Sequence, residues 1–149
     1  MAAIALLRLH HYTGDAEYRD KAQQTLEAFA GAAEPFGIFG ATYGISVVHL
    51  LKSPIQVVVL SGAEPEQAAR LTVAATAPFA FNKSVLLLNS NEAVAENLPP
   101  ALAETIPNLP QLASGKAFAV LCSGSACQPP VYDVAQLRSA LQSAILGGQ

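Results

Sequence analysis

Charge is the scarcest property of this sequence, since only 13% of its 149 residues are Asp, Glu, Lys or Arg, against about 25% in a typical soluble domain. The eight Lys and Arg residues are scattered singly, so the basic stripe that nucleic-acid binding needs is missing. Hydrophobic residues make up 52%, which excludes a disordered chain. Such a composition is typical of a domain with a face meant for another domain or subunit, although an alanine-rich, weakly polar surface explains it equally well.

Long hydrophobic runs and ligand motifs are missing too. No apolar run approaches the roughly 20 residues of a membrane-spanning helix, and Arg8 interrupts the apolar start, which also lacks the basic segment of a signal peptide. We therefore expect no membrane association and a cytoplasmic location. The sequence contains no G-x-G-x-x-G and no G-x-S-x-G, and its two cysteines alone cannot make a four-ligand zinc site. It thus predicts no cofactor, no metal and no nucleic-acid partner.

Hydrophobic spacing predicts three helices near the start, at residues 3–11, 16–30 and 40–52. The second has an apolar stripe with the 3.6-residue period of a helix, made of Tyr18, Ala22, Leu26 and Phe29. Gly14 permits a tight turn before it, and Asp15 can cap its first turn. The first two helices should therefore form a hairpin.

A boundary is predicted at Ser53-Pro54, where the pattern changes from helical to strand-like. Residues 1–53 should form an all-helical segment. Residues 54–149 should form a small α/β domain, because short apolar runs alternate there with helical stretches.

Three apolar runs predict strands in this second part, at residues 55–60, 85–88 and 117–122. Helices are expected at about residues 65–77 and after Asp133, which can cap the last one. The runs are apolar at nearly every position, which is typical of strands covered on both faces in a parallel sheet. The predicted fold class is α/β, with N-terminal helices followed by a small, mostly parallel three-stranded sheet flanked by helices.

Small polar residues follow all three predicted strands, where ligands sit in open parallel sheets. They are Ser61, Gly62, Asn89, Ser90 and Ser123. Amides in such loops, with the N-terminus of a helix, can hold an anion, so these residues form the candidate binding site. Ordinary strand-to-helix turns require the same residue types, and that is the simpler explanation.

The two cysteines, Cys122 and Cys127, are separated by four residues. A redox pair usually has two intervening residues at the start of a helix, where the thiol pKa is lowered. We therefore rank two free or partly buried thiols first, a structural disulfide second and redox catalysis a distant third.

Two stretches resemble a known family. Residues 5–22, ALLRLHHYTGDAEYRDKA, look like a helical hairpin of an (α/α)6 barrel. Residues 117–130, AFAVLCSGSACQPP, resemble the end of the large thioredoxin-domain proteins of the YyaL or spermatogenesis-associated type. The resemblance implies three parts in the parent protein: a thioredoxin-like domain with C-x-x-C, a six-hairpin barrel and a small tail region. This chain would hold the last helices of the barrel and the tail, and it has no C-x-x-C.

The expected function follows from that resemblance and from the low charge. We expect a non-catalytic accessory domain that packs on the helical barrel of its own parent chain, without a complete active site of its own. As an isolated chain it should self-associate, with a homodimer as the simplest product. The alternative is a stand-alone α/β module that binds a small anionic ligand at the strand ends.

Overall fold

A computed structural model gives the fold for residues 2–147, and at residues 33, 34, 36 and 39 it describes the backbone alone. The chain divides into two compact units, Met1–Ser53 and Pro54–Gln149. We call them the helical unit and the sheet unit. The division falls at the boundary that the sequence predicts.

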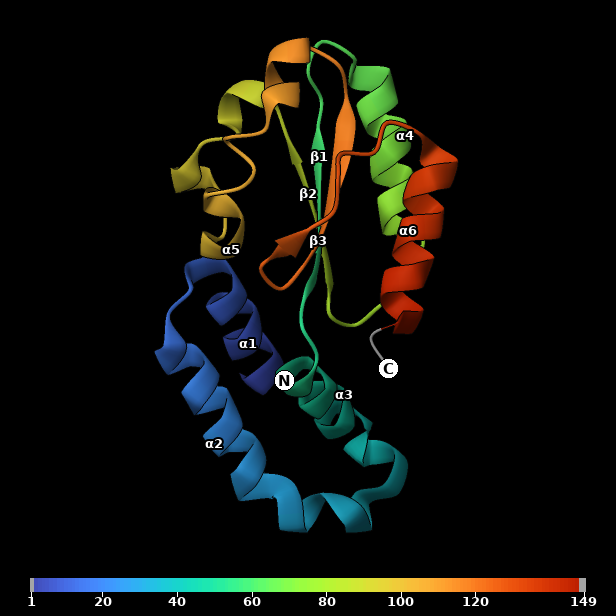
Figure 1. The fold of residues 1–149 in the computed structure, drawn as a ribbon. Coiled ribbons are helices and arrows are strands. Elements are labelled where there is room, and N and C mark those ends of the chain that lie inside the picture. The colour runs from blue at the N-terminus through green and yellow to red at the C-terminus, as the bar shows by residue number, and fades with distance from the viewer. Residues whose placement is uncertain (1, 148–149) are drawn as a thin grey trace. The chain divides into compact units, whose positions relative to one another are not determined.

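The helical unit contains a helical hairpin followed by a short 3-10 segment and a further helix (Figure 1). Its elements are α1 (Ala2–Thr13), α2 (Ala16–Ala33), η1 (Glu34–Gly40) and α3 (Ala41–Leu51). Asp15 caps α2 as predicted, because its Oδ1 accepts a hydrogen bond from the Glu17 N–H at 2.9 Å. Gly14, with a φ of 73°, makes the turn between α1 and α2.

The core of the helical unit is small. Its buried members are Ala3, Leu7, Ala22 and Leu26. Phe29 belongs to the same sequence stripe, yet its side chain is 60% exposed. The reason is helix length: α2 has 18 residues and α1 has 12. Phe29 therefore lies beyond the part of α2 that α1 covers.

Over residues 54–147, the sheet unit contains four strands in the order β2-β1-β3-β4. The strands are β1 (Ile55–Leu60), β2 (Lys83–Leu88), β3 (Phe118–Ser123) and β4 (Ala126–Cys127). The main helices are α4 (Pro65–Thr76) and α6 (Val134–Gly147), and the segment between β2 and β3 holds η2 (Ser90–Glu92), η3 (Ala95–Asn97), α5 (Pro100–Ala103) and η4 (Pro110–Ser114).

The α/β class is confirmed, but the predicted three-stranded, mostly parallel sheet is wrong. β1 and β2 are parallel, with Leu60 opposite Leu88. β3 is antiparallel to β1, and the short strand β4 returns beside it as a hairpin. The prediction failed because apolar runs show that strands are buried, without showing their direction.

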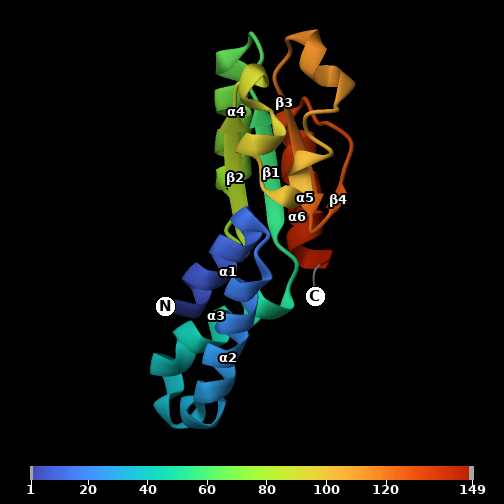
Figure 2. The ribbon, with the colours of Figure 1, turned by 90° about the vertical axis from the view of Figure 1, so that its left-hand side faces the viewer.

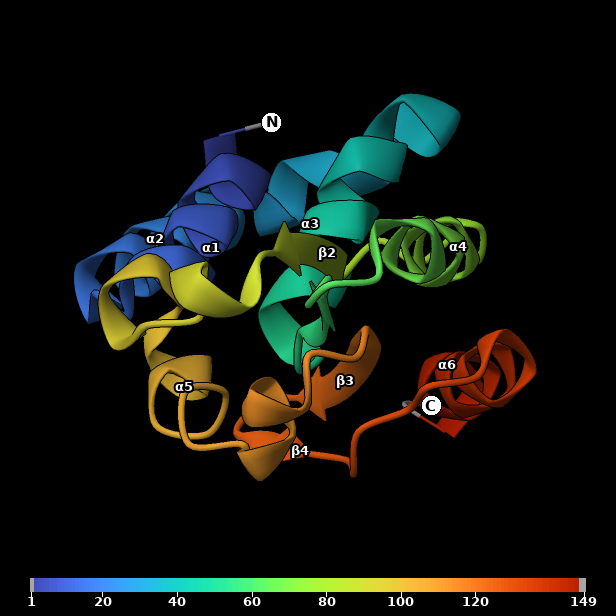
Figure 3. The same cartoon turned by 90° about the horizontal axis from the view of Figure 1, so that it is seen from above.

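Both faces of the sheet are covered, which explains the continuous apolar strands (Figures 1–3). On one face α4 and α6 pack against alternate strand residues such as Val57, Ala119 and Leu121. On the other face the segment of short helices packs against Val58, Phe118 and their neighbours. Val57, Val58, Ala119 and Phe118 are all fully buried.

None of the helices within residues 2–147 combines the length and the apolar character that crossing a membrane requires.

Candidate functional site

The carboxyl ends of β1 and β2 lie together at one end of the sheet, because these strands run parallel. This places Ser61 beside Asn89, and the Ser61 hydroxyl donates a hydrogen bond to Asn89 Oδ1 at 2.8 Å. Ser61 is buried, whereas Asn89 is exposed. Two of the predicted site residues are therefore brought together.

The Ser61 and Asn89 amides are already used within the protein. The Ser61 N–H donates to the carbonyl of Leu88 at 3.0 Å. The Asn89 N–H donates to Glu92 Oε2 at 2.8 Å, and the Asn89 side-chain amide donates to the same oxygen at 3.1 Å. An anion would have to displace the Glu92 carboxylate, which carries the same sign of charge. The contacts between Asn89 and Glu92 form a capping box for the short helix η2.

Ser123 lies at the opposite end of the strands, away from the rest of the predicted site. It pairs with Ile55, the first residue of β1, because β3 is antiparallel to β1. The start of β3, which follows Gly115 and Lys116, lies instead at the end of the sheet near Ser61. Ser90 remains at the predicted edge, and its hydroxyl oxygen is buried with no hydrogen-bond partner in the part of the chain that the structure describes.

Gly62 permits a close approach between two loops at this edge. Its φ is 50°, a conformation that side chains disfavour. A Cβ built on it would lie 2.7 Å from the carbonyl carbon of Gly115 and 2.9 Å from the carbonyl oxygen of Lys116. The next residue, Ala63, donates its N–H to the carbonyl of Gly115 at 2.7 Å. Gly62 therefore serves the loop contact rather than a ligand.

Two polar side chains that the sequence did not indicate hold α4 to its neighbours. The Ala117 N–H donates to Glu64 Oε2 at 2.9 Å, and Gln67 Nε2 donates to the carbonyl of Tyr132 at 2.8 Å. The Glu-Pro pair at the start of α4 was the one available signal, since Pro65 marks a first helical turn. It did not indicate the distant partner.

Beside these contacts lies an open hollow of about 870 Å3. Its lining includes the charged residues Glu64, Glu66, Arg70 and Lys116. Charges of both signs alternate in it, and these four side chains are exposed, so no single ligand charge is favoured. Exposure to water also weakens any one charge interaction there.

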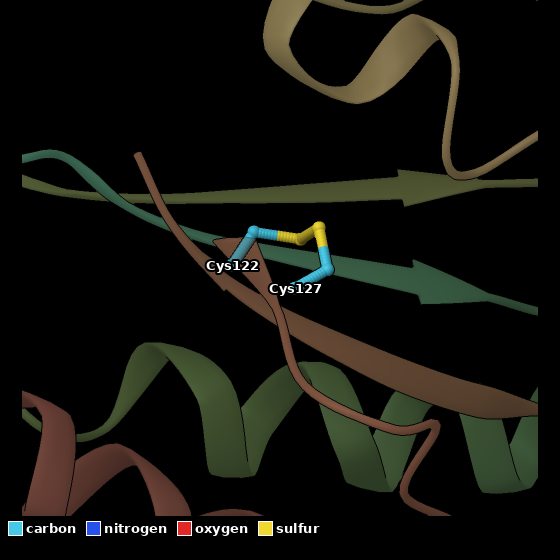
Figure 4. Close-up of a disulfide and its surroundings, with 2 residues drawn as sticks. All are labelled: Cys122 and Cys127. Atoms are coloured by element: carbon cyan, nitrogen blue, oxygen red, sulfur yellow. A yellow bond between two sulfur atoms is a disulfide. The ribbon is translucent and has the colours of Figure 1, made fainter. Parts of the chain in front are cut away.

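Cys122 and Cys127 form a disulfide in the structure, at the end of the β3–β4 hairpin (Figure 4). They are directly opposite each other. The Gln128 N–H donates to the carbonyl of Leu121, so this is a non-hydrogen-bonded pair, where side chains of antiparallel strands come closest. Free thiols were the first expectation and a disulfide the second, whereas the structure contains the disulfide. The reason is that the short hairpin was not predicted. The expected cytoplasmic location stays a prediction.

Gln56 was not singled out from the sequence either. It stands opposite Cys122 on β1 and is 2% exposed. Its side-chain oxygen is buried and finds no hydrogen-bond donor among the described residues. A glutamine inside an otherwise apolar strand was the available sequence signal.

The histidines lie in the helical unit. His10 Nδ1 is 2.9 Å from the carbonyl oxygen of Asp15. Burial lowers the pKa of His11, and nearby His10 and His49 lower it further. Burial likewise lowers the pKa of His49, with a smaller contribution from Arg8. The lowered pKa therefore favours the neutral imidazole at His11 and at His49. Within the described residues, His, Cys, Asp and Glu side chains do not form any group of three or more that could hold a metal ion.

The chain was compared with known proteins in three ways. No protein-family model matches it. No curated protein matches it significantly. No solved structure matches it significantly.

Proposed function

We propose that this chain is a non-catalytic accessory region, and that its helical unit packs on further helices of a larger parent protein. The parent would be of the YyaL or spermatogenesis-associated type, with a six-hairpin barrel and a thioredoxin-like domain. The observation that carries the proposal is the amount of apolar side chain that the helical unit leaves exposed.

Large apolar residues of the helical unit are more often exposed than fully buried. Leu7 and Leu26 are its large buried side chains within the described residues. Five others are exposed, with fractions from 44% to 84%: Leu9, Tyr12, Phe29, Ile38 and Leu51. Scattered apolar residues are normal on a surface. An excess of exposed over buried large residues in one small unit instead favours a missing partner surface.

The sheet unit gives no competing catalytic explanation. A thiol redox centre needs C-x-x-C at the start of a helix. Here α4 is preceded by Ser-Gly-Ala-Glu at residues 61–64, and Cys122 and Cys127 lie at the other end of the sheet. An accessory role therefore suits the sheet unit better than thiol chemistry.

The anion-binding alternative has weaker support. Ser123 is separated from the other candidate residues, and the Ser61 and Asn89 amides donate to internal acceptors. Isothermal titration with inorganic phosphate is the direct check, and saturable heat that Asn89→Ala abolishes would restore this alternative.

The proposal is tested by the thermal stability of the chain alone and of a longer chain that includes the preceding helices of its parent. Covering these exposed apolar side chains should raise the Tm of the helical unit by at least several degrees, because 1 kcal/mol corresponds to about 2–8 °C in units of this size. Equal Tm values would contradict the proposal.

Light scattering of the isolated chain supplies a second test. Wild type should self-associate as its concentration rises, and Phe29→Gln with Ile38→Gln should reduce the average mass. The matched control is Val73→Gln, which changes a 63% exposed residue of the sheet unit. An equal effect of the control would show that the helical face is not responsible.

A further inference from the structure

The two edges of the sheet differ in how they are protected from pairing with another strand. Proteins protect edges with short strands, prolines, bulges and charges. At one edge, β4 has two residues and is followed by Pro129 and Pro130. The opposite edge is β2, which has six residues, KSVLLL, and no proline. The β2 edge therefore offers a full-length strand.

Alternation along β2 shows which backbone groups point away from the sheet. The Ile55 N–H donates to the carbonyl of Asn82, and the Ser61 N–H donates to the carbonyl of Leu88. Even-numbered residues of β2 therefore direct their backbone groups toward β1, and odd-numbered residues direct theirs outward. Val85 and Leu87 thus present their N–H and C=O groups at the outer edge.

Lys83 is the one charged residue of β2, and its charge is held elsewhere. Its ammonium group donates to the carbonyls of Ala75, Thr76 and Pro78 at the end of α4. A lysine on an edge strand usually discourages pairing, but this one caps a helix instead. The remaining side chains of β2 are uncharged, and Leu87 is 53% exposed.

We propose that β2 pairs antiparallel with β2 of a second copy of this chain, around a twofold axis at Leu86. Val85 of each copy then lies opposite Leu87 of the other. Their outward N–H and C=O groups match, which gives two hydrogen-bonded pairs with two bonds each. The two four-stranded sheets become one continuous sheet.

A second copy fits this edge for two reasons. Residues opposite each other in this register, Val85 with Leu87, project from the same face, since both lie on the side of the sheet that α4 covers. Each exposed Leu87 thereby gains an apolar neighbour. No like charges meet along the pair, and the contact closes on itself as an isologous dimer.

Residue-resolved hydrogen exchange of the full chain tests the pairing. It is compared between about 10 µM and about 1 mM, because interfaces smaller than about 1,000 Å2 are weak. The Val85 and Leu87 amides should exchange at least about fivefold more slowly at the higher concentration. The Leu86 and Leu88 amides should be protected equally at both. Fast exchange of Val85 and Leu87 at both concentrations would overturn the proposal, and so would slow exchange at both.

A charge on the edge provides the matched variant. Leu87→Lys should abolish the concentration-dependent protection of the Val85 amide, whereas Val73→Lys, which adds the same charge on the exposed side of α4, should keep it. Protection that survives Leu87→Lys would refute the pairing. Phe29→Gln should leave the Val85 result unchanged, so failure here and failure of the proposed packing role remain distinguishable.

Discussion

Replacing Gly62 with alanine tests the close contact between the loop after β1 and the loop before β3. A Cβ at this position would lie 2.7 Å from the carbonyl carbon of Gly115 and 2.9 Å from the carbonyl oxygen of Lys116. Nothing flexible can yield, because the contacting atoms belong to the backbone. Gly62 also has a φ of 50°, which alanine adopts at a cost of about 1–2 kcal/mol.

Gly115→Ala is the matched control, because it isolates the conformational cost. Gly115 has a φ of 69°, and a Cβ there would meet nothing within 4 Å. It should therefore lower the free energy of unfolding by about 1–2 kcal/mol. Gly62→Ala should cost about 1–2 kcal/mol more than the control, because moving the loops apart breaks the 2.7 Å hydrogen bond from Ala63 to Gly115.

Urea denaturation of the sheet unit measures the difference. The amide signals of Val57 and Val58 in β1 are suitable probes, because the two units can unfold separately. The chain has no tryptophan, so fluorescence would report the sheet unit poorly. Equal destabilisation by Gly62→Ala and Gly115→Ala would refute the steric argument.

Three further predictions concern other parts of the chain. Lys83→Met should lower the free energy of unfolding of the sheet unit by about 1–3 kcal/mol, because the charged cap of α4 is lost; urea denaturation that shows no change would argue against the cap. The free energy of unfolding of the helical unit should fall as pH drops below about 6.5, because His49 has a lowered pKa in the folded state and therefore binds a proton more readily in the unfolded chain. His49→Gln should flatten this pH dependence in thermal melts followed by circular dichroism. An unchanged slope would assign the pH dependence to other groups. Reducing the Cys122–Cys127 disulfide, whose sequence separation is 5, should cost about 2 kcal/mol from loop closure; calorimetry with and without a reductant measures it, and Cys127→Ala should be insensitive to the reductant.

Much of the local structure could be predicted from the sequence because it depends on neighbouring residues. Asp15 caps α2, and Asp133 caps α6 through hydrogen bonds from the N–H groups of Ala135 and Gln136. β1 begins and ends where the apolar run does. Capping and hydrophobic periodicity act over a few residues, so they can be recognised without the fold.

The direction of β3 could not be predicted in the same way. Phe118–Ser123 is buried over its first five residues, and a run buried on both faces looks alike in either direction. The connection between β2 and β3 was the informative part. It contains several prolines and short helical segments instead of the long helix that a parallel crossover usually contains. The assumption of a parallel strand misplaced Ser123.

The reversed strand also decides what chemistry the sheet unit can support. A parallel β3 would have ended beside Ser61 and the start of α4, where a helix N-terminus lowers a thiol pKa. Because β3 is antiparallel, Cys122 lies opposite Gln56 near the other end of β1. At the start of α4, the Glu64 carboxylate instead accepts a hydrogen bond from the Ala117 N–H. The cysteines are thus separated from the N-terminus of α4, and the polar groups at that terminus hold strands and loops together. This separation argues against thiol chemistry at the start of α4.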